Sequence, residues 1–310
     1  PIVECPLLIE NRYRIYFKRL FTKAIAAPAI RVLPTWFIPF FFRKSPSIAQ
    51  TIGDRHLIAG LHINLGDLER HLGNVAAAKV HAETAFGIYE VIESPQDLAR
   101  AMNHLARSIV ILGELDEAKD YLERTCDIYR EMEDNLEINF PLRDLAEIAR
   151  KRGNFAAADE HLTEAEAVTG QLDHPEANAK IAISRAWLAY RQDEFDQAYD
   201  YADQAREKLD GLGLEVPFAK ALHALGTIEI QRENYESARE CLTDAQERYE
   251  SDAARIDAAA VQRGRGRLAL AENDLEQADE LLQSALETAE STEAVFGIAR
   301  TRYELGRLSV

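Results

Sequence analysis

Cysteine is scarce in this chain, with three residues in 310, far apart and without a CxxC pair. That number and spacing exclude a disulfide scaffold and a cysteine zinc site, and they favour a reducing compartment. The GxGxxG, Walker A, HExxH and GxSxG signatures are absent, and the eight histidines form no i, i+4 pair. We therefore expect a protein with no catalytic residues, no bound metal and no cofactor.

Basic residues are also few in comparison with acidic ones. The chain has 36 basic and 53 acidic residues, a net charge of −17, which disfavours nucleic-acid binding by the surface as a whole. The deficit is uneven, because residues 1–50 carry eight basic residues and only two acidic ones. Such asymmetry indicates two parts with different partners, which we take as an N-terminal segment, 1–52, and a second domain, 53–310.

The N-terminal segment has no uninterrupted hydrophobic run long enough to span a membrane, because Arg31 and three prolines break the stretch 24–42. Nor does it resemble a secretory signal. Instead, basic residues precede an aromatic run, an order that suits an interfacial membrane anchor. The anchor candidates are Arg12, Arg14, Lys18, Arg19, Trp36, Phe37, Phe40, Phe41 and Phe42.

Two alternatives to lipid contact stay open for this segment, besides docking on a membrane protein. Its apolar residues, including Ile25, Ile30, Leu33 and Trp36, could cap the exposed end of a repeat array. The segment could also associate with the acidic outer face of a second copy. We expect a cytoplasmic location, peripheral at a membrane if the anchor interpretation holds.

From about residue 53 the chain repeats itself every 40 residues without gaps. One alanine recurs in every unit, at positions 78, 118, 158, 198, 238 and 278. Small residues also recur twelve positions before and seven positions after it, and a polar turn such as Gly73-Asn74 precedes it. Each unit therefore reads as two amphipathic helices whose small residues mark the crossing point. A HEAT-like or generic helical array would show a looser period and more proline.

This pattern resembles the tetratricopeptide repeat family, which has small residues at positions 8 and 27 of the unit and alanine at 20. With position 1 at residues 59, 99, 139, 179, 219, 259 and 299, these places are filled in all six complete units. Two features depart from the family: the aromatic of position 4 and the proline of position 32 are missing, and the unit has 40 residues rather than 34. The resemblance implies an all-α fold, a right-handed α-solenoid of six helix pairs plus a terminal helix, with extended second helices.

The family resemblance also implies that the first helix of each unit faces a concave groove with positions 2, 5, 9, 12 and 13. Of the 34 such positions here, 13 are basic and two, Asp67 and Glu147, are acidic. A basic groove on an acidic body would attract an acidic ligand, and arginine suits carboxylate or phosphate recognition. The alternative is that the cations pair with acids on neighbouring helices. The basic groove candidates are Arg70, Arg100, Arg107, Arg143, Arg150, Lys180, Arg191, Lys220, Arg263, Arg267 and Arg300.

Other polar and aromatic side chains complete the candidate site. Trp187, Tyr190 and Tyr303 are either anchors for a peptide or packing residues, and His223 is a ligand contact or a structural group. The set Arg100, Asn103, His104 and Arg107 loosely resembles the carboxylate clamps of peptide-binding members of the family.

We expect a scaffold or adaptor that binds an acidic segment of a protein partner. The alternatives are a sensor module of a signalling or transcriptional regulator, and groove binding of nucleic acid.

Overall fold

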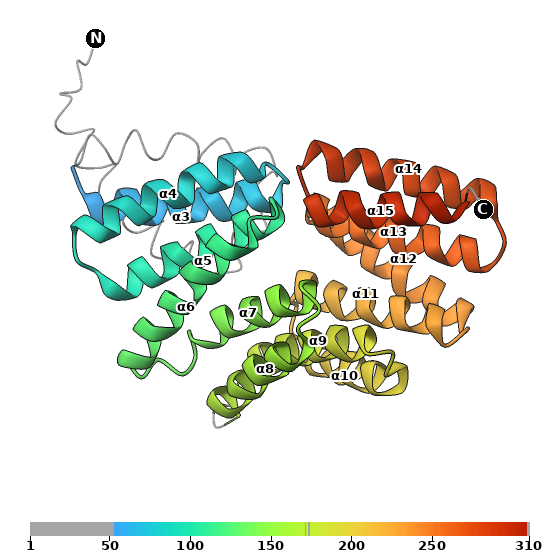
Figure 1. The fold of residues 1–310 in the computed structure, drawn as a ribbon, viewed down its shortest axis with the longest axis horizontal. Helices are drawn as coiled ribbons and strands as arrows, with labels where there is room; N and C mark the ends of the chain where they lie inside the picture. Colours follow the sequence, from blue (N-terminus) through green and yellow to red (C-terminus); the bar gives the residue numbers. More distant parts are fainter. Residues whose placement is uncertain (1–52, 171, 173, 309–310) are drawn as a thin grey trace, which may run out of the picture.

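The computed structural model describes residues 53–170, 172 and 174–308, which form thirteen α-helices and no strand. They alternate as first and second helices of a repeating pair (Figure 1). The helices are α3 (Arg55–His71), α4 (Val75–Val91), α5 (Pro95–Ile111), α6 (Leu115–Glu131), α7 (Asn139–Lys151), α8 (Phe155–Thr169), α9 (Pro175–Arg191), α10 (Phe195–Leu209), α11 (Glu215–Gln231), α12 (Tyr235–Ser251), α13 (Arg255–Ala271), α14 (Leu275–Ser291) and α15 (Val295–Leu308). Six pairs and a seventh first helix are confirmed.

The 40-residue period is confirmed in the backbone as well as in the helices. The turn inside each unit contains one residue with positive φ, at Gly73, Gly113, Gly153, Asp193, Glu233 and Asn273. In the first unit the N–H of Asn74 reaches back to the carbonyl of Glu69 at 2.7 Å, the six-to-one bond of a Schellman cap. The first helix of each of the six pairs ends at the same register position, from His71 to Ala271.

The recurring alanines lie where the paired helices cross. Ala78, Ala118, Ala158, Ala198, Ala238 and Ala278 are all fully buried. The approach is closest in the fifth unit, where a Cβ added to Gly226 would stand 2.6 Å from Cγ of Leu242. Small residues at the crossing thus set the distance between helix axes, as predicted.

Four second helices, α4, α6, α12 and α14, have 17 residues each. Second helices are not selectively extended: α3, α5, α9, α11 and α13 have the same 17 residues as the longest second helices. The six residues beyond the ordinary repeat length are therefore shared by both helices of a unit. Unit three is the exception, because α7 has only 13 residues and carries Pro141 in its first turn.

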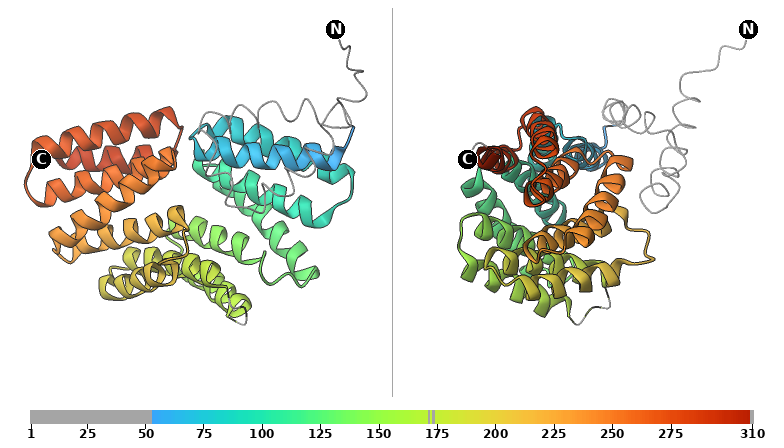
Figure 2. Two further views of the ribbon diagram at one scale, coloured as in Figure 1. Left: turned by 180° about the vertical axis from the view of Figure 1, so that it is seen from behind. Right: turned by 90° about the vertical axis from the view of Figure 1, so that its right-hand side faces the viewer.

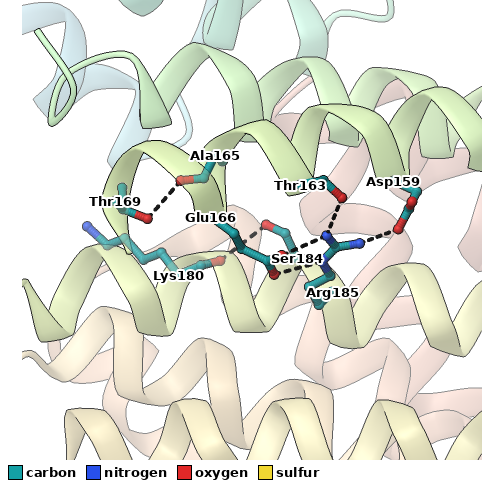
Figure 3. Close-up of polar contacts among 8 residues, drawn as sticks. All are labelled: Asp159, Thr163, Ala165, Glu166, Thr169, Lys180, Ser184 and Arg185. Atoms are coloured by element: carbon teal, nitrogen blue, oxygen red, sulfur yellow. Dashed lines mark hydrogen bonds and ion pairs between the residues drawn. The ribbon is translucent and has the colours of Figure 1, made fainter. Parts of the chain in front are cut away.

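A buried arginine joins two neighbouring units outside the apolar core. Arg185 of α9 is one-tenth exposed and donates to Glu166 of α8 at 2.8 Å and to the hydroxyl of Thr163 at 2.9 Å (Figure 3). It also pairs with Asp159 one turn away. All three guanidinium nitrogens of Arg185 donate to side chains of α8, and these bonds fix the angle between α8 and α9.

The solenoid curves until its first and last repeats meet (Figures 1 and 2). Nε2 of His71, at the end of α3, lies 3.0 Å from the Asp252 carboxylate, in the turn before α13. A Cβ on Gly73 would stand 2.6 Å from Cγ2 of Thr292, and one on Gly113 would stand 3.3 Å from Cγ1 of Val295. We call this contact between the ends of α3, α5 and α7 and the starts of α13 and α15 the seam.

The predictions for residues 1–52, namely the anchor candidates and the capping alternative, lie outside the described residues. Within the described helices, none is both long enough and apolar enough to cross a bilayer.

Candidate ligand-binding groove

The first helices form the inner layer of the solenoid. Each contacts the first helix of the next unit, as α9 contacts α11 and α11 contacts α13. Side chains of this layer meet across several units: Nη2 of Arg267 on α13 donates to the hydroxyl of Tyr190 on α9 at 2.8 Å. The structure therefore places these two predicted groove residues on the same inner surface.

Many of the groove cations have acidic partners in this chain. Arg70 pairs with Asp67 at 2.5 Å, and Nε of Arg267 lies 3.3 Å from Glu304. The remaining pairs are Arg107 with Asp144 at 3.9 Å, Lys220 with Asp257 at 3.8 Å, Arg150 with Glu147, and Lys180 with Glu176. These six cations thus pair with acidic residues of the same chain, which was the alternative to ligand binding in the sequence analysis. They contribute little net positive charge to the groove.

The acidic groove residue Asp67 forms a cluster with three neighbours. Burial opposes its ionisation, but the charges of Arg70, His104 and Arg107 outweigh burial and hold the pKa of Asp67 well below its usual range. Burial lowers the pKa of His104 to about 4, although Asp67 acts in the opposite direction. His104 is therefore neutral near pH 7, where it can accept or donate a hydrogen bond without adding charge.

The clamp-like set is divided among three carboxylates. Arg100, which is exposed, lies 3.4 Å from Asp97, and Asn103 donates to Asp144 at 3.3 Å. Nδ1 of His104 lies 3.7 Å from Asp67. A ligand carboxylate would have to compete with these residues for the same donors, so this set is a weaker anion site than its composition indicates.

Four groove cations have no ion pair within the described residues: Arg143, Arg191, Arg263 and Arg300. Arg143 lies over the ring of Phe140 at 5.5 Å, and burial lowers its pKa. Burial and the charges of Arg300 and Arg267 lower the pKa of Arg263 to about 10. Because these four side chains form no ion pair with a described residue, they are the strongest candidates for anion contact.

The inner aromatic residues pack against one another. Trp187 makes edge contacts with Tyr190 at 5.8 Å and with His223 at 5.3 Å. Burial lowers the pKa of His223 to about 3, so its ring is neutral and packs as an apolar group. Tyr303 differs, since it is 68 % exposed on α15. Trp187 and Tyr190 therefore serve the packing of the inner layer, while Tyr303 is free to contact a partner.

Sequence reasoning missed the acidic partners. Asp144 and Glu304 both occupy position 6 of their units, one helical turn from the basic groove positions 2 and 9. Helical i, i+3 and i, i+4 spacing could have identified them as neighbours of the groove cations. It also missed Phe296, whose ring lies 4.4 Å from Nζ of Lys151 across the seam. No sequence signal places these two residues together, because their contact depends on the overall curvature.

In the part of the chain that the structure describes, no group of three or more His, Cys, Asp or Glu side chains is placed to hold a metal ion.

Several solved structures share this architecture over most of the chain. A Rap protein complexed with competence and sporulation factor matches with a TM-score of 0.63 and 14 % identity, over 97 % of this chain and 94 % of that one. A plasmid-encoded Rap regulator of conjugation genes, in complex with a peptide, matches with a TM-score of 0.67 and 16 % identity, over 92 % and 73 %. A signal-transduction ATPase with a tetratricopeptide repeat sensor, from Pyrococcus horikoshii, has a TM-score of 0.56 and 16 % identity, over 99 % and 50 %. At these identities the likeness is one of fold.

No curated protein shows significant sequence similarity to the chain. The tetratricopeptide repeat family model matches two regions, residues 57–131 and 217–291. The 40-residue register continues unbroken between them, through the buried crossing alanines Ala158 and Ala198. Repeat pattern, helix pairing and model match agree: the units in residues 57–131 and 217–291 are tetratricopeptide repeats, and the units between them continue the same register and fold.

Proposed function

We propose that the protein is a non-catalytic adaptor that binds an acidic segment of a protein partner along the inner surface of its solenoid. The observation that carries this proposal is the set of inner-surface arginines without an acidic partner, namely Arg143, Arg191, Arg263 and Arg300. Tetratricopeptide folds are typical of protein-interaction scaffolds, and the unpaired cations give this one a preferred ligand charge.

Concave geometry strengthens the attraction of such a surface. Protein surrounds the inner side chains on several sides, so field lines between them pass through material of low dielectric constant. Arg107 shows the effect of these surroundings on a guanidinium group. Its side chain is about two-thirds covered by protein (34 % exposed), and the charge of Arg70, together with this partial burial, lowers its pKa. An acidic segment would relieve this repulsion and contribute carboxylates to the open guanidinium forks.

Two structural neighbours support a peptide-like ligand. Both Rap structures were solved as complexes, one with competence and sporulation factor and one with a peptide. The overlap covers more than nine-tenths of this chain in each case. Proteins with this fold therefore include one that was solved with a bound peptide.

The test uses two unpaired arginines whose loss breaks no ion pair within the described residues. Arg143→Glu with Arg191→Glu should abolish binding of a fluorescein-labelled acidic peptide measured by anisotropy, because a desolvated charge contact is worth about 2–5 kcal/mol. The melting temperature should stay unchanged. Proteins captured from a native extract and quantified by mass spectrometry would then identify the natural partner.

The matched control reverses two exposed cations on second helices, Arg124 of α6 and Lys208 of α10. Arg124→Glu with Lys208→Glu changes the net charge by the same amount without touching the inner surface. Equal loss of binding in both double variants would attribute the effect to total charge and refute a groove site. Tighter binding of a nucleic-acid oligomer than of the acidic peptide, with steep salt dependence, would point to the nucleic-acid alternative.

We also propose that residues 1–52 attach the adaptor to a membrane surface or to a membrane protein. Support comes from the sequence order alone, with cations such as Arg12 and Lys18 before the aromatic run that contains Trp36 and Phe41. The full-length protein should sediment with anionic vesicles, and Trp36→Ala with Phe41→Ala should abolish sedimentation. Failure of the unmodified protein to sediment with anionic vesicles or native membranes would refute attachment.

A second candidate function, a sensor module of a regulatory system, is favoured by the overlap with the Rap gene regulator and with a tetratricopeptide sensor. A sensor requires that ligand binding alter affinity for a second protein. An adaptor binds its partners additively. Measuring the affinity of a captured partner with and without the acidic peptide distinguishes the two.

A further inference from the structure

A cavity of about 160 Å³ lies at the seam, between the first and last repeats. The N-terminal half contributes Val110 and Ile111 from the end of α5 and Lys151 from the end of α7. The C-terminal half contributes residues of α13, α14 and α15, including Arg263 and Arg300. The cavity therefore exists only while the solenoid is closed, because its two walls are more than 100 residues apart in sequence.

The repeat pattern explains why a cavity forms at the junction between α14 and α15. In α14, Ala289 occupies the register position that holds Tyr89, Tyr129 and Tyr249 in units one, two and five. Those tyrosines are fully or almost fully buried, and each fills the junction with the following first helix. At the last junction the alanine faces Gly297, whose added Cβ would stand 3.3 Å from Cβ of Ala289. Units three and four also lack the ring, with buried Thr169 and Leu209 at this position, but Ala289 is the smallest of the six side chains and lines the cavity.

Three cations line the cavity: Lys151, Arg263 and Arg300. Lys151 shares Glu147 with Arg150, at 3.1 Å from its own Nζ. Neither Arg263 nor Arg300 has an ion pair in the described part of the chain. Burial and the charge of Arg300 lower the pKa of Arg263, and burial and the charge of Arg150 lower the pKa of Arg300. Within residues 53–308 the cavity therefore carries two arginines without an ion pair, and the nearby carboxylates Glu147 and Glu304 act on them only at longer range.

Apart from Thr292, the rest of the lining is apolar. Ile256, Ala260 and the ring of Phe296 join Val110 and Ile111, and Nζ of Lys151 lies 4.4 Å from the Phe296 ring centre. A cavity of about 150 Å³ accommodates a molecule of the size of benzene. Cations beside an apolar wall of that size match a ligand with one anionic group and a small apolar body.

We propose that the seam cavity binds a small carboxylate with an apolar body, either as a free acid or as the C-terminal residue of a peptide. Arg263 and Arg300 receive the carboxylate, since an arginine fork matches its two oxygens. The apolar body occupies the space that a tyrosine fills at other junctions. Because both halves of the solenoid contribute walls, the ligand links the first and last repeats. Arg263 and Arg300 also belong to the inner-surface arginines proposed to contact an acidic segment, and the variants below separate the two ligands.

The first test titrates the full-length protein with N-acetyl-leucine and with benzoate by calorimetry. N-acetyl-leucine amide is the uncharged control. We expect at least one acid to bind and the amide to bind at least about tenfold more weakly, because it lacks the charge that the arginines receive. Absence of binding by both acids, or equal binding of the amide, would overturn the proposal.

Charge variants separate the site from general electrostatics. Arg263→Gln and Arg300→Gln should each weaken acid binding at least about tenfold. The matched control is Arg302→Gln on α15, because Arg302 is 64 % exposed and pairs outward with Glu290 at 2.7 Å. If Arg302→Gln weakens binding as much as Arg300→Gln, the acid is held by general charge and the site is refuted.

Two further variants separate this site from the acidic-segment groove. Ala289→Tyr restores the residue of the other junctions and should abolish acid binding while leaving binding of the acidic peptide intact. Arg143→Glu with Arg191→Glu should do the opposite. A cooperative thermal melt would show that the Ala289→Tyr variant folds. If that variant does not fold, Arg263→Gln and Arg300→Gln still test the site. Retained acid binding in a folded Ala289→Tyr variant would place the acid outside the cavity.

One comparison of affinities distinguishes a free acid from a peptide C-terminus as the source of the carboxylate. A decapeptide ending in leucine that binds at least about tenfold more tightly than N-acetyl-leucine, and loses that gain on amidation, identifies a peptide C-terminus. Equal or weaker binding of the peptide identifies a free acid.

Discussion

Arg267 donates a hydrogen bond to the hydroxyl of Tyr190 across 77 positions of sequence, at 2.8 Å. The bond passes over α11 and connects the fourth unit directly to the sixth. Ordinary solenoids are held by contacts between adjacent repeats alone, so their stability is close to a sum of neighbour interactions. Here an inner-surface bond couples units that are not neighbours.

Removing this bond should destabilise the chain without changing its core. Tyr190→Phe keeps the ring contacts with Trp187 and Phe195 but loses the hydroxyl, which leaves one donor of Arg267 without its acceptor. We expect a loss of about 0.5–1.5 kcal/mol in the free energy of unfolding by urea. Tyr303→Phe, at an exposed site, is the control, and an equal loss there would show that the cross-unit bond contributes nothing.

The seam should respond to pH through His71. The hydrogen bond to the Asp252 carboxylate raises the pKa of His71 above its ordinary value of 6.5, against the opposing effect of burial. A raised folded-state pKa means that the stabilisation is fully present below the unfolded pKa and is lost as pH rises through the folded one. His71→Gln should therefore lower Tm more at about pH 5.5 than at about pH 8.5.

His161→Gln is the matched control for this pH dependence. Burial lowers the pKa of His161, so its charged form is disfavoured in the fold and its replacement should not cost stability at low pH. A Tm difference for His71→Gln that is the same at both pH values would mean that the His71–Asp252 pair does not stabilise the seam.

A larger side chain at a helix crossing should be costly. Ala198 is fully buried where α10 crosses α9, so Ala198→Leu should reduce the free energy of unfolding by about 1–3 kcal/mol through overpacking. Ala156→Leu, on the exposed side of α8, adds the same atoms and should be nearly neutral. An unchanged melt for Ala198→Leu would contradict the assignment of this alanine to a crossing point.

One turn between units should be stabilised by glycine. Ala253 has φ of 56°, in the left-handed region that disfavours a Cβ, and its side chain is exposed. Ala253→Gly should raise the free energy of unfolding by about 0.5–1 kcal/mol, because relief of strain exceeds the added entropy of the unfolded chain. Ala167→Gly, within α8, should lower it by a similar amount. A loss of stability in Ala253→Gly would mean that the left-handed turn carries no strain.

Local repeats are what the sequence could predict. Register positions such as Ala118 and Gly153 fix the helix pairs and turns, because each unit meets its neighbour through the same few residues. Long-range closure could not be predicted in this way. The contact of Gly113 with Val295 depends on small rotations accumulated over five units, and no local pattern records their sum.

The helix register predicts which positions belong to the candidate groove, but it does not predict the net positive charge that the groove carries. Two residues that the register assigned to the inner face, Arg267 and Tyr190, contact one another across the first helices. Net charge was overestimated, because the register counted five positions per helix and left out position 6, where Asp144 and Glu304 neutralise Arg107 and Arg267. Ion pairing between adjacent helices depends on side-chain reach, which a list of facing positions does not contain.

The seam limits how this chain can change its length. Arrays of repeats commonly grow or shrink by gaining or losing a whole unit, since each new unit needs only its neighbours. With His71 held against Asp252 and Gly73 packed on Thr292, an inserted unit would displace the last helices from the first, and a deleted one would leave them out of reach. The number of units between these contacts, within residues 53–308, is therefore fixed, and a relative with more or fewer units between them would have to open the seam.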